Sequence, residues 1–241
     1  MVYSMLRLVW VVCISLPFII YYFFRLIYVE LHPDRFTEED RYVIGRHMVN
    51  QAMRNSFVHT KAFGLENLPR EGGYVMYPNH QGKFDVLGII HVHEKPCTIV
   101  IDEKRSHLPL ANEVTRLLNG VRLDRSDIRS QVEGIMRIAE EVKNGRRYIL
   151  FPEGGYTFNE NHLQEFHAGA FKCALKAKCP IVPVVLVDSY IPFGRNGIQP
   201  VFTQVHFLEP ISYEAYEGRS TKEIASMVKK AIQDKLDSLK K

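Results

Sequence analysis

A histidine and an aspartate lie five positions apart in the segment YPNHQGKFD, residues 77–85. On a regular helix, side chains with this spacing point about 140° apart around the axis, and on a strand they point to opposite faces. His80 and Asp85 can therefore meet only if the chain turns after a strand and Asp85 opens a helix. A carboxylate on Nδ1 of an imidazole fixes the tautomer and leaves Nε2 free as a base. The segment predicts a general-base pair, and the alternative is a capping aspartate beside an ordinary loop histidine.

The neighbouring segments have the composition that this layout requires. YVMYP, residues 74–78, predicts a strand, residues 78–82 a turn, and residues 84–94 a helix. Strand-like segments at residues 97–102, 120–125, 147–153, 180–189 and 201–210 then alternate with helix-like segments at residues 108–119, 126–143, 168–178 and 221–239. This alternation predicts an α/β fold with a largely parallel central sheet flanked by helices.

The helix expected after residue 125 has a clear apolar period. Ser126 is its predicted N-cap, and Asn144–Gly145 is a natural left-handed end. Apolar residues recur at helical spacing, so we expect one face to pack on the sheet: Ile128, Val132, Ile135, Ala139 and Val142.

Polar residues follow four of the predicted strands. Ligands of such sheets bind beyond the carboxyl ends of the strands. We therefore expect one cleft to hold the groups found there: Asn79 and His80 with Asp85, Lys104–Arg105, Asp124–Arg125, and Glu153 in the PEGGY segment.

The N-terminus predicts a membrane-associated helical segment. Residues 8–24 hold no charged residue, and about 20 apolar residues span a bilayer. Pro17 leaves a re-entrant hairpin as the alternative to a spanning helix. Bulky aromatic residues and no small-residue cleavage site follow, which argues against a signal peptide. Arginines are more frequent after the segment than before it, which predicts an active site on the cytoplasmic face.

A second helix should begin at the TEED segment, residues 37–40, which resembles a capping box. Apolar and basic residues form separate stripes along it, with Ile44, Met48 and Ala52 on one and Arg46, Asn50 and Arg54 on the other. Such a helix either lies on a lipid surface or packs on the domain.

The bulk composition limits the class of partner. The chain has 241 residues and a net charge of +4 without one basic block, which favours anionic small substrates or lipid head groups over nucleic acid. Its four cysteines lack metal-site spacing, so we expect reduced thiols.

Four blocks of the sequence resemble, in order, those of the glycerolipid acyltransferase family, the type that acylates lysophosphatidate. The family's Asn-His-x4-Asp corresponds to Asn79, His80 and Asp85. Its Gly-x4-Arg corresponds to Gly120 and Arg125, with Lys104 as the upstream basic residue. Its Phe-Pro-Glu-Gly-Thr-Arg-Ser corresponds to FPEGGYT, residues 151–157, and its Val-Pro-Val block to residues 181–187. The blocks cover roughly residues 60–205. Together with the apolar N-terminus, they predict a membrane anchor with an amphipathic helix, residues 1–57, and an acyltransferase domain, residues 58–241.

The resemblance implies acyl transfer from a thioester donor, acyl-CoA or acyl carrier protein, to the sn-2 hydroxyl of lysophosphatidate, giving phosphatidate for phospholipid biosynthesis. It implies that His80 and Asp85 are catalytic, with oxyanion donors near Gly82 or Gly154, and that neither a cofactor nor a metal is needed. Membrane lipid is the expected partner. Substrate contacts are implied for Asn79, Lys104, Gly120, Arg125, Glu153 and Gly154.

Tyr156 stands where the family carries an arginine implicated in acceptor binding. A different lyso-lipid or a glycerol phosphate therefore remains open as the acceptor. Two other classes also remain: a metal-dependent hydrolase and a non-catalytic membrane scaffold. The metal alternative rests on a local set of ligand types, His80, Asp85, His91, His93 and Glu94.

Overall fold

A seven-stranded sheet organises the residues that this computed structural model describes, which are 4–107, 111–157, 159–194 and 199–240. Its strand order is β1-β7-β6-β2-β5-β3-β4. The strands are β1 (Val58–Phe63), β2 (Tyr74–Pro78), β3 (Thr98–Asp102), β4 (Val121–Leu123), β5 (Arg147–Ile149), β6 (Ile181–Val187) and β7 (Val201–Phe207).

Strand direction decides where the loops meet. β6, β2, β5, β3 and β4 run parallel to one another, whereas β7 is antiparallel to β6 and parallel to β1. The chain leaves the five parallel strands at one edge of the sheet, so the segments after them lie together. The predicted α/β fold with a largely parallel sheet is confirmed.

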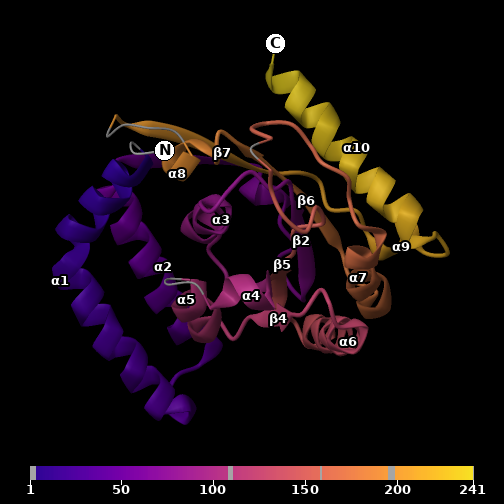
Figure 1. The fold of residues 1–241 in the computed structure, drawn as a ribbon. Helices are drawn as coiled ribbons and strands as arrows, with labels where there is room; N and C mark the ends of the chain where they lie inside the picture. The colour runs from indigo at the N-terminus through magenta and orange to yellow at the C-terminus, as the bar shows by residue number, and fades with distance from the viewer. Residues whose placement is uncertain (1–3, 108–110, 158, 195–198, 241) are drawn as a thin grey trace.

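Helices cover both faces of the sheet, as Figure 1 shows. One face carries α2 (Glu38–Asn55), α3 (Asp85–Val92) and α5 (Ala111–Leu117), and the other carries α6 (Ile128–Lys143), α7 (Lys172–Ala177) and α10 (Thr221–Leu239). Side chains alternate along each strand, so Tyr74 and Met76 of β2 pack under α2 and α3 while Val75 and Tyr77 pack under α6 and α10. The short helices are η1 (Pro33–Arg35), η2 (Leu65–Asn67), α4 (Glu103–Ser106), η3 (Ala168–Phe171), α8 (Ile191–Gly194) and α9 (Tyr213–Tyr216).

The start and the buried face of α6 differ from the sequence prediction. Asp127, and not Ser126, is its N-cap, and the Asp127 carboxylate accepts from the Arg129 N–H. Ile128 and Val132 are 78% and 53% exposed, because α6 is buried only from Gly134 onward, where Leu123 of β4 packs closely against it. The predicted helix end is confirmed by the C-cap Asn144 and the left-handed Gly145.

β1 is an element that the sequence did not predict. Only Val58 is buried, and the remaining residues of VHTKAF alternate between exposed and partly exposed. A short strand of this kind has a weak periodic signal, and its partner β7 lies more than a hundred residues away in the chain. Only the tertiary pairing distinguishes it from a loop.

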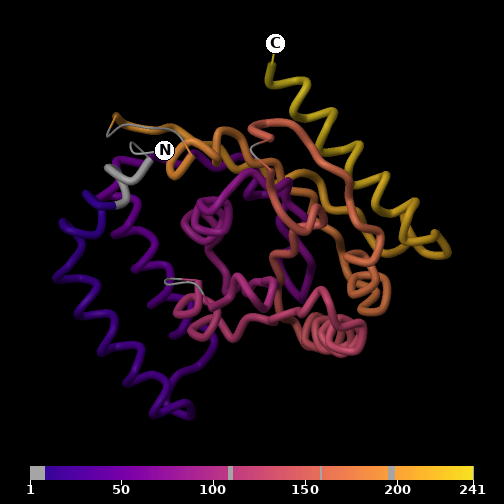
Figure 2. Tube along the Cα trace, in the orientation of Figure 1, coloured from indigo at the N-terminus to yellow at the C-terminus, as the bar shows by residue number. Residues whose placement is uncertain are grey.

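The N-terminal segment is one continuous helix, α1 (Ser4–Leu31), which runs through Pro17 without a hairpin. Within the described residues, Val9–Leu31 is long and apolar enough to cross a membrane. α1 packs antiparallel to α2 at one side of the α/β layers (Figure 1, Figure 2). The contact runs from Leu26 and Val29, packed with Ile44, to the hydrogen bond from Asn55 Nδ2 to Ser15 Oγ at 2.7 Å.

α2 packs on the domain through one face, and its predicted contact with a lipid surface stays a prediction. The predicted capping box is confirmed, since Thr37 and Asp40 exchange side-chain and backbone hydrogen bonds. Tyr42, Val49 and Met53 belong to the core that α3 shares with the sheet. The boundary predicted after residue 57 therefore separates two elements that share one core.

Gly73, directly before β2, lies against the main chain at the end of α6. An added Cβ would lie 2.1 Å from the Val142 carbonyl oxygen and 2.6 Å from that of Arg146. Because backbone cannot rotate away, we expect Gly73→Ala to cost about 1–3 kcal/mol in the free energy of unfolding. Chemical denaturation measures it. Gly169→Ala is the matched control, since nothing lies within 4 Å of its added Cβ; equal stability of the two variants would contradict this packing.

Candidate active site

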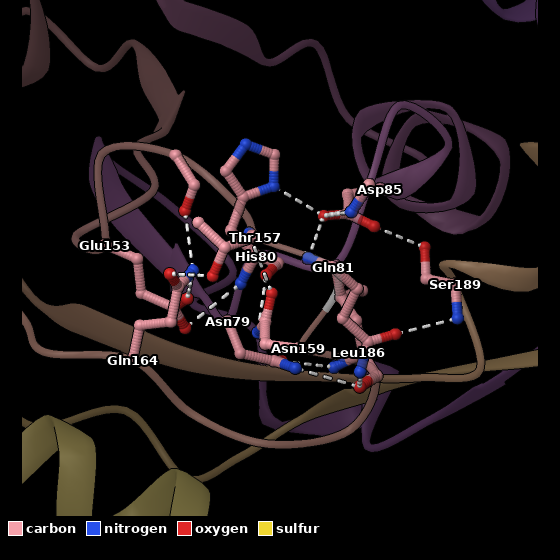
Figure 3. Close-up of polar contacts among 12 residues, drawn as sticks. Asn79, His80, Gln81, Asp85, Glu153, Thr157, Asn159, Gln164, Leu186 and Ser189 are labelled. Carbon is pink, nitrogen blue, oxygen red and sulfur yellow. Dashed lines mark hydrogen bonds and ion pairs between the residues drawn. The ribbon is translucent and has the colours of Figure 1, made fainter. Parts of the chain in front are cut away.

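The pair predicted from the sequence is brought together at the carboxyl end of β2. His80 lies in the turn after the strand, and Asp85 is the first residue of α3. His80 Nδ1 is 2.6 Å from Asp85 Oδ2 (Figure 3). The predicted strand–turn–helix layout is thus confirmed. It brings together two side chains that are five positions apart in the sequence.

The Asp85 carboxylate is completely buried and held by several donors. Besides His80 Nδ1, its Oδ2 accepts from the Gln81 N–H at 2.7 Å and the Gly82 N–H at 3.0 Å. Its Oδ1 accepts from Ser189 Oγ at 2.6 Å. These contacts leave the carboxylate one orientation, with Oδ2 facing the imidazole.

The imidazole of His80 lies between two aromatic rings. Phe151 stacks on it with ring centroids 4.2 Å apart, and Tyr156 meets it edge to face at 4.8 Å. The His80 side chain is 14% exposed. Among the residues that the structure describes, no group bonds to Nε2, so this nitrogen is available to a substrate proton.

Glu153 supports the main chain beneath His80. Its Oε1 accepts from the His80 N–H at 3.2 Å, and its Oε2 accepts from Gln164 Nε2 at 2.8 Å. Burial raises the pKa of this carboxyl above its ordinary value, although the hydrogen bonds from Gln164 and His80 oppose the shift. In this structure Glu153 positions the histidine; a contact with substrate stays a prediction.

Asn79 ties the end of β2 to β6. Its Nδ2 donates to the Leu186 carbonyl at 3.1 Å, and its Oδ1 accepts from the Leu186 N–H at 2.7 Å. The side chain is buried, and both of its polar atoms are engaged by main chain. The arrangement holds the turn that carries His80, and the substrate contact implied for Asn79 stays a prediction.

Two guanidinium groups border the turn after Pro152. Arg125 Nη1 donates to the Gly154 carbonyl at 2.7 Å, and Arg105 Cζ lies 5.5 Å from the centre of the Tyr156 ring. Gly154 has a φ of +68°, and an added Cβ would lie 2.3 Å from Arg125 Nη2. The positive φ favours glycine at this position, whereas the Arg125 guanidinium lies at the end of a flexible side chain and could move away from a Cβ.

The structure adds Arg105 to the residues that the family blocks single out. Lys104 is exposed on α4 near Asp124, whose pKa is held below its ordinary value by Ser126 hydrogen bonds and, to a lesser degree, by the Lys104 charge. The neighbouring Arg105 reaches Tyr156 instead. Spacing alone could not choose between adjacent basic residues, because the choice depends on which one faces the sheet edge.

Gly120 is not brought to His80. It precedes β4, and an added Cβ would lie 3.0 Å from the Ile99 carbonyl oxygen and 3.0 Å from Thr115 Cγ2. Its visible role is to let β3, β4 and α5 pack closely. The substrate contact implied for it stays a prediction.

The ligand types that suggested a metal site face different partners. His91 Nδ1 lies 2.6 Å from Asn50 Oδ1, while His93 is hydrogen-bonded to Tyr74 Oη and the Lys95 carbonyl, each at 2.7 Å. No group of three or more histidine, cysteine, aspartate and glutamate side chains gathers within the described parts of the chain. The local cluster in the sequence therefore does not form a metal-binding cluster.

Comparison with known proteins gives the family. The family model described as Acyltransferase matches residues 59–187, which is more than half of the sequence. This chain belongs to the acyltransferase family.

Two relatives carry the name 1-acyl-sn-glycerol-3-phosphate acyltransferase. The one from Saccharomyces cerevisiae is 29% identical over 74% of this chain and 60% of its own length. The one from Borreliella burgdorferi is 27% identical over 73% of this chain and 71% of its own. The match to this chain covers only half to three fifths of the length of the first two relatives in the comparison.

A solved structure confirms the fold. The crystal structure of the 1-acyl-sn-glycerophosphate acyltransferase PlsC from Thermotoga maritima aligns with a TM-score of 0.79. The alignment covers 98% of this chain and 96% of that one at 24% identity. The N-terminal helices and the α/β domain thus occur together in a known architecture.

The buried, neutral His93 predicts a pH dependence of stability. Burial lowers its pKa from 6.5 to about 4, so the stability it contributes is complete above pH 6.5 and is lost as pH falls toward 4. The loss should reach about 3 kcal/mol. Urea unfolding of His93→Gln from pH 7 to 4.5 should show a flatter dependence than wild type, whereas parallel curves would contradict a neutral His93.

Proposed function

We propose that this chain is a 1-acyl-sn-glycerol-3-phosphate acyltransferase, which moves an acyl chain from a thioester to the sn-2 hydroxyl of lysophosphatidate. The observation that carries the proposal is the His80–Asp85 pair, in which His80 Nε2 has no partner among the described residues. Two arginine side chains contact the neighbouring turn after Pro152. This arrangement suits deprotonation of a hydroxyl and binding of a phosphate, and two relatives carry the name 1-acyl-sn-glycerol-3-phosphate acyltransferase.

In the proposed reaction His80 Nε2 removes the proton of the acceptor hydroxyl as its oxygen attacks the thioester carbonyl. General-base catalysis of this kind contributes typically about 10²–10⁴-fold. Asp85 keeps the imidazole oriented and stabilises the imidazolium that forms. When the tetrahedral intermediate collapses, the C–S bond breaks, and the departing thiolate takes the proton from His80.

Backbone N–H groups near Gly82 and Gly154 stay the proposed oxyanion donors, but the N–H groups of these two glycines are themselves engaged. The Gly82 N–H donates to Asp85 Oδ2 at 3.0 Å, and the Gly154 N–H donates to the Phe151 carbonyl at 3.1 Å. Neither is free for a tetrahedral intermediate in this conformation. Both remain hydrogen-bond donors in the turns that border His80, but the oxyanion would have to displace their present acceptors.

For the acceptor phosphate we assign Arg125 and Arg105, with Lys104 as the residue predicted from the family block. Hydrogen bonds to a charged group contribute about 1.5–3 kcal/mol each. Tyr156 stands where the family has an arginine, but the Arg105 guanidinium lies over its ring and places a positive charge there. Because of Tyr156, a second class of acceptor remains an alternative: a lyso-lipid or glycerol phosphate with a differently shaped head group.

The donor is proposed to be acyl-CoA or acyl carrier protein, with no cofactor and no metal in the chemistry. The two donors share the thioester that the mechanism uses. The rate of acyl transfer, measured with each donor in turn, identifies which one the enzyme uses. The two differ for the enzyme because only the carrier protein presents a folded surface to it.

For the membrane we propose that α1 lies along one leaflet and does not cross the bilayer. α1 packs on α2 between Ser15 and Val29, and α2 carries exposed His47 and Arg54. A crossing α1 would take these polar side chains into the hydrocarbon, where a charge such as that of Arg54 costs about 2.5–3.5 kcal/mol at the centre. The outer side of α1 is apolar and accessible, with Val9, Trp10, Leu16, Phe18, Ile20, Tyr21, Phe23, Phe24 and Leu31 exposed. The predicted location of the active site on the cytoplasmic face remains part of the proposal.

His80→Ala should lower kcat by at least about 10²-fold, because the hydroxyl loses its base. Asp85→Asn should be nearly as damaging. Acyl transfer to lysophosphatidate, followed with a labelled donor, measures both, and thermal unfolding confirms that the variants fold. Near-wild-type transfer by folded His80→Ala would end the proposed mechanism.

Removing either arginine should weaken binding of the acceptor. Arg105→Gln and Arg125→Gln should each raise the acceptor KM about 10- to 100-fold and leave the donor KM nearly unchanged. Lys104→Gln on the same helix shows which basic residue acts, and the exposed Lys143→Gln is the remote control. Unchanged lysophosphatidate kinetics in both arginine variants would point to an acceptor without a phosphomonoester.

Thiol labelling tests the placement of α1. In a Cys13→Ala background, Ser4→Cys and Glu39→Cys should both react with a membrane-impermeant maleimide from the same side of sealed vesicles. If α1 crossed the bilayer, only one of them would react before detergent is added. The protein should stay with the membrane through a carbonate wash, and its release would show that α1 is not an anchor.

A further inference from the structure

Ser189 contacts the general-base pair from the side opposite the histidine. It lies in the turn after β6 and is 3% exposed. Figure 3 shows its hydroxyl reaching the Asp85 carboxylate, where Oγ donates to Oδ1 at 2.6 Å. His80, Gln81 and Gly82 all donate to the other oxygen. Ser189 is the one donor to Oδ1 among the residues that the structure describes.

The position of Ser189 is fixed by a partly buried network of side-chain amides. Its N–H donates to Gln81 Oε1 at 2.8 Å, and Gln81 Nε2 donates to Asn161 Oδ1 at 2.7 Å and to the Leu186 carbonyl at 2.9 Å. Asn161 in turn holds Asp188, accepting its N–H at 2.9 Å and donating to its carboxylate at 2.9 Å. Asp188 has a φ of +59°, a conformation that such local bonds stabilise. The turn after β6 is therefore held in place independently of the Ser189 hydroxyl.

We propose that Ser189 is a positioning residue for the base, acting through Asp85. A carboxylate held at one oxygen can still rotate about that contact, and a buried acceptor left without a donor is costly. The hydroxyl fixes the second oxygen, so that Oδ2 stays directed at His80 Nδ1 while charge develops on the imidazole. For its kinetic readout this inference rests on the proposed acyl transfer; its structural readout does not.

Ser189→Ala isolates the contact, because the alanine keeps the N–H that binds Gln81. We expect kcat to fall about 5- to 50-fold, with the KM of each substrate changed less than about twofold. Ser189→Thr keeps a hydroxyl and should recover most of the loss. Ser56→Ala is the matched control: its buried hydroxyl makes one hydrogen bond, to Met53, at the end of α2.

A double-mutant cycle separates positioning from a merely structural role. If Ser189 acts through Asp85, Ser189→Ala should lower kcat little further in the Asp85→Asn background. Losses of kcat that multiply, or an unchanged kcat in Ser189→Ala alone, would overturn the inference.

Proton NMR tests the inference without any substrate. The Nδ1–H of His80 should give a downfield resonance, assigned by its loss in His80→Ala. Ser189→Ala should shift or broaden it, and Ser56→Ala should not. An unchanged resonance in Ser189→Ala overturns the inference, whereas a shifted resonance in an enzyme that does not acylate lysophosphatidate removes only the proposed function.

Discussion

The buried carboxylate of Asp85 is the interaction on which the site depends. A carboxylate removed from water must find its donors within the protein, and this one finds them in the turn after β2, which includes His80, and in the turn after β6. Satisfying it requires these two turns and the start of α3 to meet, so the same contacts that offset its burial also orient the imidazole. The hydrogen bonds that stabilise the turn are thus the same ones that set the geometry of His80.

The sheet makes that meeting possible. Because β6, β2, β5, β3 and β4 run in one direction, the loops that follow them share an edge. Asn79 fastens β2 to β6 at that edge through the Leu186 main chain, and Glu153 fastens the loop after β5 to the His80 N–H. Along the strands, apolar side chains alternate between the two faces of the sheet and form the core. The polar contacts therefore gather at the edge where the strands end.

The turn of residues 154–156 shows how one substitution is accommodated. Tyr156 packs edge to face on His80 and lies under Arg105, so a ring occupies the place of a cation and a neighbouring helix supplies the charge. A cation over a tyrosine ring is a favourable contact, and it leaves the guanidinium edge free for an anion. In the proposed acceptor site, the ring would therefore set the shape together with the charges.

The sequence by itself determined the alternation of strands and helices, the catalytic candidate pair and the apolar N-terminal helix, because periodicity, capping and spacing are local properties. It placed α10 at its observed bounds and α2 at its capping box. Tertiary structure decided the rest: the pairing of β1 with β7, the buried face of α6, the packing of α1 on α2, the contact of Arg105 with Tyr156, and the contact from Ser189 to Asp85. These depend on residues distant in the chain, and which side chain faces which neighbour is fixed only when the elements pack.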